Sequence, residues 1–517
     1  MSTGSSRAQQ YVHYRSADPI QILYLEHSNF LTGSENTFLD LRPLLLPAAN
    51  SGVDAQVSSF SRYFYNDNVP NLENTGELWV GKGNTIFSSI HLDVWSKHFF
   101  FSTEPYVQYA QNKSFMSYHF DRVTKDSSDF IEYFHVLNDG PARGNGQVKE
   151  LRFRETQIYG HLNGIGAGFS TANMWWGPGI HNTINMTNNT SGFPHFVLGT
   201  LREQRVRNIG LHLMYVFGQP TLTDHQPYFT AIIGASTFYS EPIITLGFVR
   251  TYLSGGSDHP GVSWGEAALK PFEAFFKESF YNGDGSGTDI ENDPDDQTVD
   301  LFLTLQFPKS GLKLFIQYGW TDHRWDWFDF RAHPDHASAS IIGFRKYGLF
   351  DLEELSLGFE YTNLMDSRFH KQRGDGYAPY WYAYPRYDYN TNDGRRYTAH
   401  SGTDSDDLLI YFAWLSEKRS IRLSFNYERH GVVYSVELVD QTGSFHYPEN
   451  KLELNIDYRQ PARLGELYLF YEYELTENLG SPASGVFPRG DTPFRKANVY
   501  GIGFETQLGR WNLFGDE

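Results

Sequence analysis

Three segments near the C-terminus alternate apolar and polar side chains with a period of two, and this pattern limits the folds open to the chain. They are residues 420–428, 451–459 and 467–475. Alternation of this kind is typical of β-strands with one apolar and one polar face. In a soluble sandwich the apolar faces would pack against each other, whereas in a membrane barrel they would contact lipid. The alternation alone predicts strands in either fold.

The lengths of the connections between the predicted strands decide between the two folds. Short connections span residues 308–311, 350–354, 416–420 and 460–465, and long ones span residues 281–297, 320–340, 364–406, 430–450 and 478–496. Regular alternation of short and long connections is typical of antiparallel strands that cross a membrane, with tight periplasmic turns and large extracellular loops. We therefore predict an all-β chain that folds into a large antiparallel transmembrane β-barrel.

Composition agrees with a barrel and excludes several other classes of protein. Aromatic residues make up 17% of the 517 residues, and the mean hydropathy is -0.48. Barrels combine aromatic belts with a polar lumen, which gives such an average. No run approaches the ~18 apolar residues that a spanning helix needs. The net charge of -19 argues against nucleic acid as a partner, and the lack of cysteine excludes disulfides and thiolate sites.

The N-terminal part of the chain lacks the strand rhythm. We predict that residues 1–75 form a small periplasmic segment leading into the barrel, and that residues 76–517 form the barrel with its surface loops. Within the first segment, Gln21 to Glu26 is predicted as a strand. Residues 1–16 lack the apolar core of a secretory signal, so we expect that the numbering begins near a cleavage site or that the true start lies upstream.

One later segment departs from the strand pattern. Leu269, Phe272, Phe276 and Phe280 follow helical spacing. The spacing predicts a short helix from Gly265 to Phe280 that lies on the rim or in the mouth of the barrel.

Sequence motifs for catalysis or cofactor binding are missing. The chain has no H-E-x-x-H, G-x-S-x-G or phosphate-binding loop. Residues 282–293 partly resemble a calcium-binding EF-hand loop, but Asp289 stands at the apolar position and no bidentate glutamate closes the loop. Carboxylates are plentiful, yet nothing marks two of them as a glycosidase pair. We predict no catalytic residue, no metal site and no cofactor, and hence a protein that is not an enzyme.

Two regions, residues 173–200 and 377–407, combine aromatic rings with amides, carboxylates and arginines. Sugars present apolar C–H faces and hydroxyl edges, so their sites pair flat rings with such polar groups. The predicted glycan-binding residues are Trp175, Trp176, Asn182, Asn189, His195, Trp381, Tyr382, Tyr384, Arg386, Asp404 and Asp406. The alternative is an aromatic girdle with ordered polar loops, which any barrel could carry. Composition alone leaves both interpretations open.

The first of these regions resembles the signature of the capsule-assembly Wzi family of outer-membrane proteins. The matching residues are Trp-Trp-Gly-Pro-Gly at 175–179, Asn-Asn at 188–189, Phe-Pro-His at 193–195 and Leu-Gly-Thr at 198–200. The second region is similar to a later block of that family, with Trp-Tyr at 381–382 and His-Ser-Gly-Thr-Asp-Ser-Asp at 400–406. The two blocks occur in the same order as in the family.

The resemblance implies a barrel of about eighteen strands in the outer membrane. It implies a lectin, without enzymatic activity or cofactor, that attaches capsular or other exported polysaccharide to the cell surface. Its partners would be surface polysaccharide, outer-membrane lipid, lipopolysaccharide and other envelope proteins. The signature segment would shape the mouth or lumen as much as touch sugar. The residues themselves leave open a pore for a nutrient or exported polymer, a surface hydrolase, and a barrel subunit of a larger envelope complex.

Overall fold

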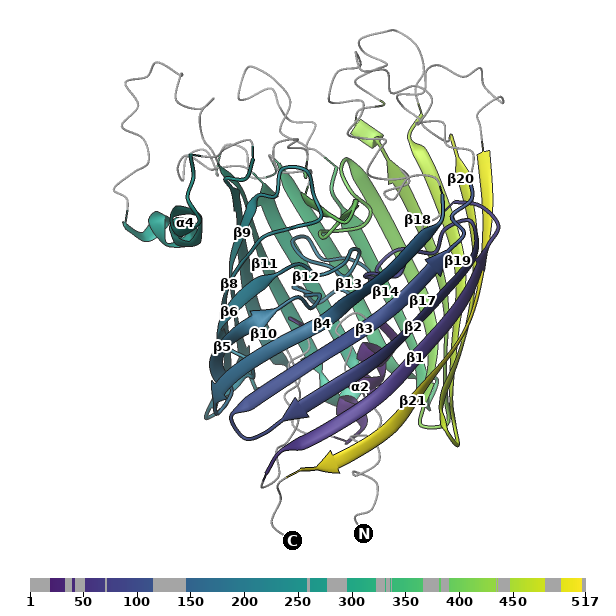
Figure 1. Ribbon diagram of the computed structural model, residues 1–517, viewed down its shortest axis with the longest axis horizontal. Coiled ribbons are helices and arrows are strands. Elements are labelled where there is room, and N and C mark those ends of the chain that lie inside the picture. The colour runs from purple at the N-terminus through teal and green to yellow at the C-terminus, as the bar shows by residue number, and fades with distance from the viewer. Residues whose placement is uncertain are drawn as a thin grey trace.

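The computed structural model describes residues 19–32, 40–41, 52–69, 72–114, 146–257, 261–276, 295–321, 331, 335, 337–365, 381–382, 390–433, 435, 447–478 and 494–513. Most of these residues lie in long strands that form the wall of a barrel (Figure 1). The wall strands of the first half are β1 (Asp54–Asn66), β2 (Gly83–Trp95), β3 (Phe99–Ala110), β4 (Val148–Leu162), β5 (Ile165–Ser170), β6 (His195–Thr200), β7 (Gln204–Val206), β8 (Ile209–Gly218), β9 (Tyr228–Phe238) and β10 (Ile243–Ser254).

The wall strands of the second half are β11 (Asp295–Phe307), β12 (Leu312–Thr321), β13 (Ser338–Leu349), β14 (Leu352–Asn363), β17 (Ser405–Ser416), β18 (Arg419–His430), β19 (Glu449–Ala462), β20 (Gly465–Glu477) and β21 (Phe494–Asn512). Outside the wall, the described elements are the helices α2 (Pro19–Thr32) and α4 (Trp264–Phe276), the 3-10 turn η2 (Pro308–Ser310) and the small pair β15 (Thr391–Asn392) and β16 (Arg395–Arg396).

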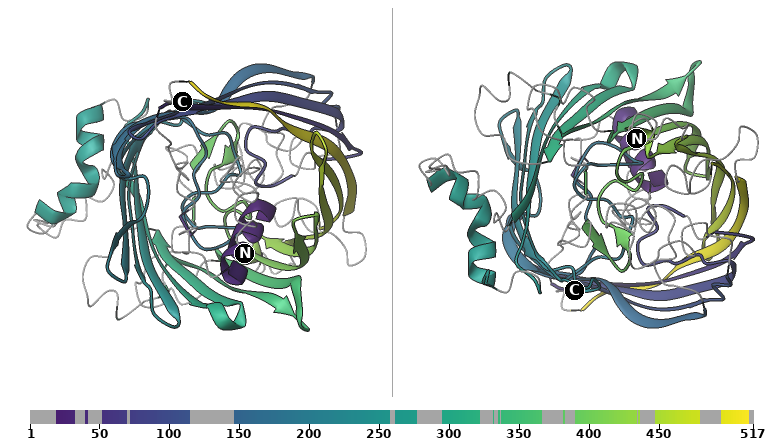
Figure 2. Two further views of the ribbon diagram at one scale, coloured as in Figure 1. Left: turned by 90° about the horizontal axis from the view of Figure 1, so that it is seen from below. Right: turned by 90° about the horizontal axis from the view of Figure 1, so that it is seen from above.

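The wall closes on itself. Neighbouring strands pair antiparallel along the chain, and β1 pairs with β21 from Asp54 opposite Asn512 to Asn66 opposite Val499 (Figure 2). The described residues place nineteen strands in this sheet, and β6 and β7 are two pieces of one strand because both pair with β8. Counting those two pieces once gives eighteen strands. The prediction of a large antiparallel barrel is confirmed.

The two faces of the wall strands differ as the sequence pattern requires. Leu151 and Phe153 of β4 point outward and are 74% and 68% exposed, as lipid-facing side chains of a barrel are in the absence of lipid. In β20, Glu472 and Glu474 point into the lumen and are buried, whereas Leu469 points outward. The predicted assignment of apolar residues to the outside and charged residues to the inside is confirmed for this strand.

The connections alternate in length as predicted. A turn of two residues separates Ser416 of β17 from Arg419 of β18, whereas 364–404 join β14 to β17 at the opposite end. In outer-membrane barrels the short turns face the periplasm. We therefore call the end with the short turns, where β1 begins and β21 ends, the periplasmic end, and the opposite end the mouth (Figure 1).

The wall begins earlier than the sequence indicated. β1 starts at Asp54, inside the range 1–75 that was assigned to a periplasmic segment, so the predicted boundary at residue 76 is too late. Strand β1 escaped detection because DAQVSSFSRYFYN carries serines and only weak alternation.

The segment from Gln21 to Glu26 is helical, and its prediction as a strand is wrong. It lies in α2, which occupies the lumen close to the periplasmic end (Figure 1). Ile22 and Leu23 of α2 pack against Tyr411 of the wall. Six residues can alternate between apolar and polar by chance, so the pattern was too short to predict a strand. The helix is stabilised by contacts with strands far along the chain, which a local pattern does not reveal.

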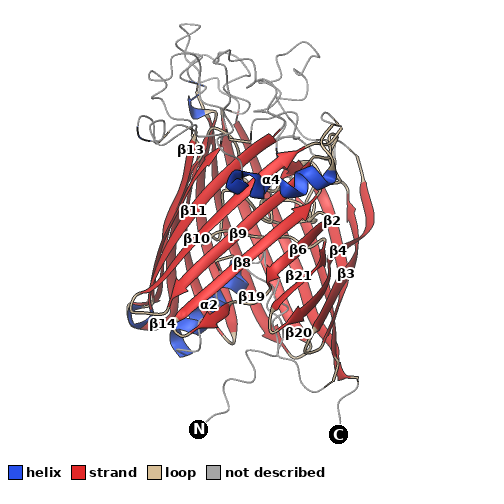
Figure 3. Ribbon diagram, turned by 90° about the vertical axis from the view of Figure 1, so that its left-hand side faces the viewer, coloured by secondary structure: helices blue, strands red, loops and turns tan. Residues whose placement is uncertain are grey.

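The predicted short helix from Gly265 to Phe280 is confirmed as far as Phe276 by α4, which spans Trp264–Phe276, and residues 277–280 lie outside the described residues. This helix lies outside the barrel and runs across β8, β9 and β10 near the mouth (Figures 2 and 3). Tyr215 Oη of β8 donates a hydrogen bond to the carbonyl of Ala268 at 2.7 Å, which holds the helix against the wall. Trp264 and Leu269 point away from the wall and are exposed.

Neither described helix is long and apolar enough to cross a membrane.

Candidate functional site

The first region marked by the sequence does not stay at the surface. Residues 171–194, which we call the inner loop, join β5 to β6 and fold into the lumen, where Figure 2 shows chain inside the ring of strands. Trp176 stacks on Phe229 of β9 with ring centroids 5.9 Å apart, and Phe193 meets the same ring edge-on at 5.4 Å. The aromatic residues of the inner loop are thus the core of a plug.

The carboxylate of Glu360 in β14 anchors the inner loop to the wall. It accepts hydrogen bonds from three successive backbone N–H groups, those of Ile180 at 2.8 Å, His181 at 3.3 Å and Asn182 at 2.7 Å. Gly179 permits this turn, because a Cβ there would lie 2.1 Å from the carbonyl oxygen of Asn182. One buried wall residue therefore satisfies the backbone of the loop where it turns.

The second region marked by the sequence joins the first inside the lumen. The Thr187 N–H donates to the carbonyl of Tyr397 at 2.6 Å, and the Thr187 hydroxyl donates to the carbonyl of Thr398 at 2.6 Å. Tyr382 Oη donates to the carbonyl of Ile184 at 2.5 Å. Two blocks more than 180 residues apart in sequence thus form one body, which we call the plug: the inner loop together with residues 381–382 and 390–404.

The predicted glycan-binding residues that the structure describes are all buried in or against this plug. These residues are Trp175, Trp176, Asn182, Asn189, His195, Trp381, Tyr382, Asp404 and Asp406. The four aromatic rings are at most 2% exposed, so in this conformation they offer no open face to a sugar. Tyr384 and Arg386 lie outside the described residues, as does the partial EF-hand match at 282–293. Sugar contact by these residues stays a prediction, and their burial favours the alternative that they shape the lumen.

The polar members of the set have identifiable partners. Asn182 bridges the plug to the wall, because its amide donates to Asp407 of β17 at 2.8 Å and its carbonyl accepts from the His400 N–H at 2.9 Å. Asp406 accepts from the Arg429 Nε at 2.7 Å, and Asp404 accepts from the Val433 N–H at 3.0 Å. Their hydrogen bonds are structural.

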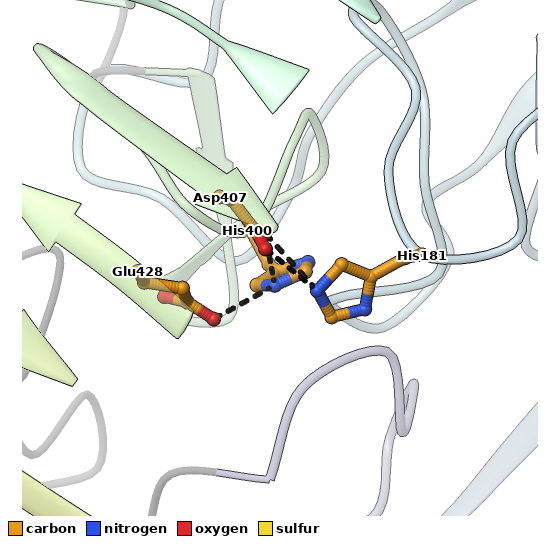
Figure 4. Close-up of side chains that lie close together, drawn as sticks. All are labelled: His181, His400, Asp407 and Glu428. Atoms are coloured by element: carbon orange, nitrogen blue, oxygen red, sulfur yellow. Dashed lines mark hydrogen bonds and ion pairs between the residues drawn. The ribbon is translucent and has the colours of Figure 1, made fainter. Parts of the chain in front are cut away.

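Four side chains that can bind metals meet between the plug and the wall (Figure 4). They are His181 of the inner loop, His400 of the plug, Asp407 of β17 and Glu428 of β18. The His181 Nε2 lies 3.0 Å from Asp407 Oδ2, and the His400 Nε2 lies 3.3 Å from both Asp407 Oδ2 and Glu428 Oε1. All four are buried or nearly so.

This histidine–carboxylate cluster changes the acidity of its imidazoles. Burial alone would lower the pKa of His181, but the Asp407 carboxylate raises it above its ordinary value. Burial acts in the same direction on His400, but the hydrogen bonds that its imidazole donates to the carboxylates of Asp407 and Glu428 raise its pKa well above the usual range. Without a metal, the cluster thus favours positive charge at the imidazole nitrogens, and any metal ion that binds there must displace a proton from each ligating nitrogen.

A second polar contact fixes α2 under the plug. Glu26 accepts two hydrogen bonds from Arg345 NH1, at 2.8 and 2.9 Å, and one from Lys313 Nζ at 2.7 Å. Lys313 also contacts Asp40 at 2.5 Å. Burial alone would raise the pKa of Glu26, but Arg345 and then Lys313 lower it to about 2. Arg345 also donates to the carbonyl of Pro178, which links α2, wall and plug.

The lumen beside the plug is lined by charged and aromatic side chains. The cavity lies between the plug and the strands β1, β4 and β18 to β20, and α2 reaches it with Pro19 and Ile20. Its charged lining consists of Arg62, Glu73, Arg154, Arg422, Glu453, Asp457, Arg459 and Glu472. Among the described residues, the plug thus leaves a cavity on this side of the lumen.

At the mouth, a shallow polar pocket lies between the connection from β8 to β9 and the segment after β10. Its lining residues are Gln219, Asp224, His225, Gln226, Tyr228, Gly256, Ser257 and Val262. The Gln219 N–H donates to the carbonyl of Pro194 at 3.0 Å, and the Asp393 N–H donates to the carbonyl of Leu222 at 2.9 Å. The plug therefore supports this pocket from below.

Sequence reasoning missed the wall residues that hold the plug. Glu360, Arg345 and Asp300 sit at lumen-facing positions of their strands, which alternation can locate, but nothing in the sequence names their partners. It also passed over His181 and His400, which stand inside the two marked regions. The available signal is a histidine in each of two polar, ring-rich segments that both resemble blocks of one family.

The fold and the lumen first define the class: a closed antiparallel barrel of the outer-membrane type, plugged by its own loops. The sequence profile of the family described as capsule assembly protein Wzi matches residues 71–480. Because this match covers most of the 517 residues, the chain belongs to the capsule assembly protein Wzi family. The predicted family and the outer-membrane type of the barrel are confirmed.

Solved structures agree with this fold. The Wzi protein of Escherichia coli, described as a carbohydrate-binding β-barrel of the outer membrane involved in group 1 capsule assembly, is 10% identical with a TM-score of 0.54, and the likeness covers 86% of this chain and 83% of that one. OccAB2 of Acinetobacter baumannii is 8% identical with a TM-score of 0.41, over 88% of this chain and 98% of that one. The likeness to the Escherichia coli Wzi structure shows the fold alone. The likeness to OccAB2 is too low to support any argument about this chain. No curated protein sequence matches the chain.

Proposed function

We propose that this protein binds exported polysaccharide at the mouth of its plugged barrel and holds it at the outer membrane during capsule assembly. The observation that carries the proposal is the family match over residues 71–480. The solved Wzi structure, whose protein is described as carbohydrate-binding, supports the same function. Three further partners stay predictions: outer-membrane lipid, lipopolysaccharide and other envelope proteins. The lack of enzymatic activity also stays a prediction.

We place the sugar contact in the polar pocket at the mouth rather than on the buried tryptophans. The pocket offers a carboxylate, two amides, an imidazole and a serine hydroxyl next to the ring of Tyr228. Sugar sites combine such groups with an aromatic face. The loop is held by its own contacts, since the Gln219 amide donates to the carbonyl of Gln226 at 2.7 Å and the Ser257 N–H donates to that of His225 at 2.8 Å. A preorganised loop binds with less loss of entropy.

Binding of purified surface polysaccharide to the purified barrel tests both parts of the proposal. We expect wild-type protein to retain the polysaccharide and Asp224→Asn and Gln226→Ala to weaken retention about tenfold, the loss of one or two hydrogen bonds. Glu417→Gln is the matched control, because Glu417 is also an exposed carboxylate but lies at the periplasmic end. A wild-type barrel without retention contradicts the function, whereas retention that both pocket variants preserve contradicts only the placement.

The charged cavity beside the plug favours a second candidate function, a pore for a nutrient or for an exported polymer. Arginines and carboxylates both line it, and rings of charged side chains line the pores of ion channels. The two functions differ in conductance, since a plugged binding barrel should be nearly silent in a planar bilayer. Steady ion conductance by the wild-type protein would favour the pore.

A further inference from the structure

The buried cluster of His181, His400, Asp407 and Glu428 has the composition and spacing of a transition-metal site. We propose that it binds one divalent transition-metal ion, with zinc as the best fit, and that the ion fastens the plug to the wall. This inference does not depend on polysaccharide binding. Two imidazoles and two carboxylates form a donor set that suits zinc.

The distances in the cluster match those between ligands around a small ion. Zinc binds nitrogen at ~2.0–2.1 Å and carboxylate oxygen at ~2.0–2.2 Å, so neighbouring ligands of a tetrahedral site lie about 3.3 Å apart. The His400 Nε2 lies 3.3 Å from Asp407 Oδ2 and 3.3 Å from Glu428 Oε1, and the His181 Nε2 lies 3.0 Å from Asp407 Oδ2. The four donor atoms all lie within 4.8 Å of one another. The ligands therefore need only small rotations to close around an ion.

Neighbouring side chains hold the ligands in place. The Asn182 amide donates to Asp407 Oδ2 at 2.8 Å, and the Asn426 amide donates to Glu428 Oε1 at 2.7 Å. His430 lies 3.1 Å from the second oxygen of Glu428. Outer partners of this kind orient metal ligands and fix their protonation.

One further contact bears on the imidazole of His400. Its Nδ1 lies 3.3 Å from the amide nitrogen of Asn74, while the buried amide oxygen of Asn74 has no hydrogen-bond partner. Turning this amide over would let the oxygen accept a proton from Nδ1 and free Nε2 for a metal, at the expense of the bond from Asn74 to the carbonyl of His181. As the structure stands the amide nitrogen faces Nδ1, so Asn74 becomes an acceptor for a metal-bound imidazole only after this turn.

A nearby acidic group shows why the ion belongs at the histidines. Glu73, Glu428 and Glu453 also come together, but the ammonium of Lys451 already lies among them, 2.8 Å from Glu453 Oε1 and 3.6 Å from Glu428 Oε1. That position is filled by a cation of the chain itself. His181 and Asn426 both line the cavity beside the plug, so an ion can reach the histidine–carboxylate cluster from the lumen.

The ion would join parts of the chain that are distant in sequence. His181 belongs to the inner loop, His400 to the second block of the plug, and Asp407 and Glu428 to adjacent wall strands. A bound metal would therefore hold both halves of the plug to β17 and β18, and its removal would loosen the plug while the barrel wall stayed closed.

Titration with cobalt tests the proposal on the full-length barrel in detergent, after treatment with a chelator and its removal. We expect one Co²⁺ per chain, visible absorption bands of the intensity of four-coordinate cobalt, and loss of those bands when Zn²⁺ is added. Zn²⁺ alone should raise the temperature at which the folded gel band disappears. Weak, octahedral-type absorption or no saturable binding by the wild-type protein would overturn the proposal.

Substitutions locate the site. His400→Gln and His181→Gln should each abolish the four-coordinate bands and the stabilisation by Zn²⁺, in protein that still shows the heat-modifiable mobility of a folded barrel. His195→Gln is the matched control, because His195 is a buried histidine of β6 whose Nδ1 contacts the Phe193 carbonyl at 2.8 Å. If His400→Gln does not fold, His181→Gln on the inner loop decides the question. Cobalt bands that persist in either folded variant contradict the assignment.

Discussion

The hydrogen bonds from the inner loop to Glu360 should control how often the plug opens. In Glu360→Gln, one carboxylate oxygen becomes an NH2 group that faces the N–H of Ile180 or Asn182, now 2.8 or 2.7 Å away. One buried N–H then loses its acceptor, which costs about 1–3 kcal/mol. The remaining hydrogen bonds are made to a neutral group instead of a carboxylate, which about halves their strength. We estimate a total loss of about 3 kcal/mol in the free energy that holds the loop closed.

The lack of native cysteine makes this loss measurable. Thr183 of the inner loop is fully buried, so Thr183→Cys reports opening through the rate at which a maleimide labels it in the folded barrel. A loss of about 3 kcal/mol raises the open fraction, and with it the labelling rate, on the order of 100-fold in Glu360→Gln. Glu241→Gln in the same background is the control, since Glu241 forms only an exposed pair with Lys309 and should leave the rate unchanged.

The reasoning about Glu360 fails if the labelling rate of Glu360→Gln stays within about threefold of the parent while gel mobility shows a folded barrel. Such a result would mean that the backbone of the loop is held by its other contacts, those of Thr187 and Asn185 among them. A rise in Glu241→Gln equal to that in Glu360→Gln would contradict the reasoning as well, because it would show a general loosening of the barrel.

Three further predictions concern the plug and α2. Arg345→Met removes a cation from the buried carboxylate of Glu26, so the barrel should lose about 3–5 kcal/mol of stability in urea titration, whereas a change below about 1 kcal/mol would contradict the role of the pair. The pKa of Glu26 is about 2 against an ordinary 4.5, so its stabilisation is complete above pH 4.5 and is lost as the pH falls towards 2. The melting temperature of the wild type should therefore fall more steeply over that window than that of Glu26→Gln, and parallel curves would refute this. Trp176→Ala should lower the free energy of unfolding by about 3–5 kcal/mol, because it removes a buried ring. The folded variant should still retain polysaccharide, and loss of retention would place the sugar at the plug.

The wall of this barrel could be predicted because the sequence patterns that specify its strands and turns involve only residues close together in the chain. Alternation in residues 467–475 places Glu472 and Glu474 inside and Leu469 outside, and the structure agrees. Connection lengths then fix the antiparallel order and the two ends of the barrel, since each strand pairs with its neighbour in sequence. Neither step requires knowledge of a distant contact.

The contents of the lumen could not be predicted in the same way. Polar loops usually lie on the surface of a protein, so polar segments rich in Trp and Tyr are predicted there. A wall of eighteen strands encloses enough space to hold such loops in its lumen, and here they lie inside. α2 was misread for a related reason: Glu26 meets Arg345, 319 residues away, and no window of sequence contains both. The family signature marked both blocks, yet it could not say that they meet inside the lumen and pack their rings together.

If the exposed side of α4 meets the membrane, this helix sets the height at which the barrel sits in its bilayer. A helix that lies flat across the outside of β8 to β10 with Trp264 and Leu269 facing away is suited to the boundary between acyl chains and headgroups, where tryptophan is favoured. Raising or sinking the barrel would move those side chains into water or into hydrocarbon. Val262, which lines the polar pocket at the mouth, comes two residues before the start of this helix, so the same placement would hold the pocket close to the membrane surface.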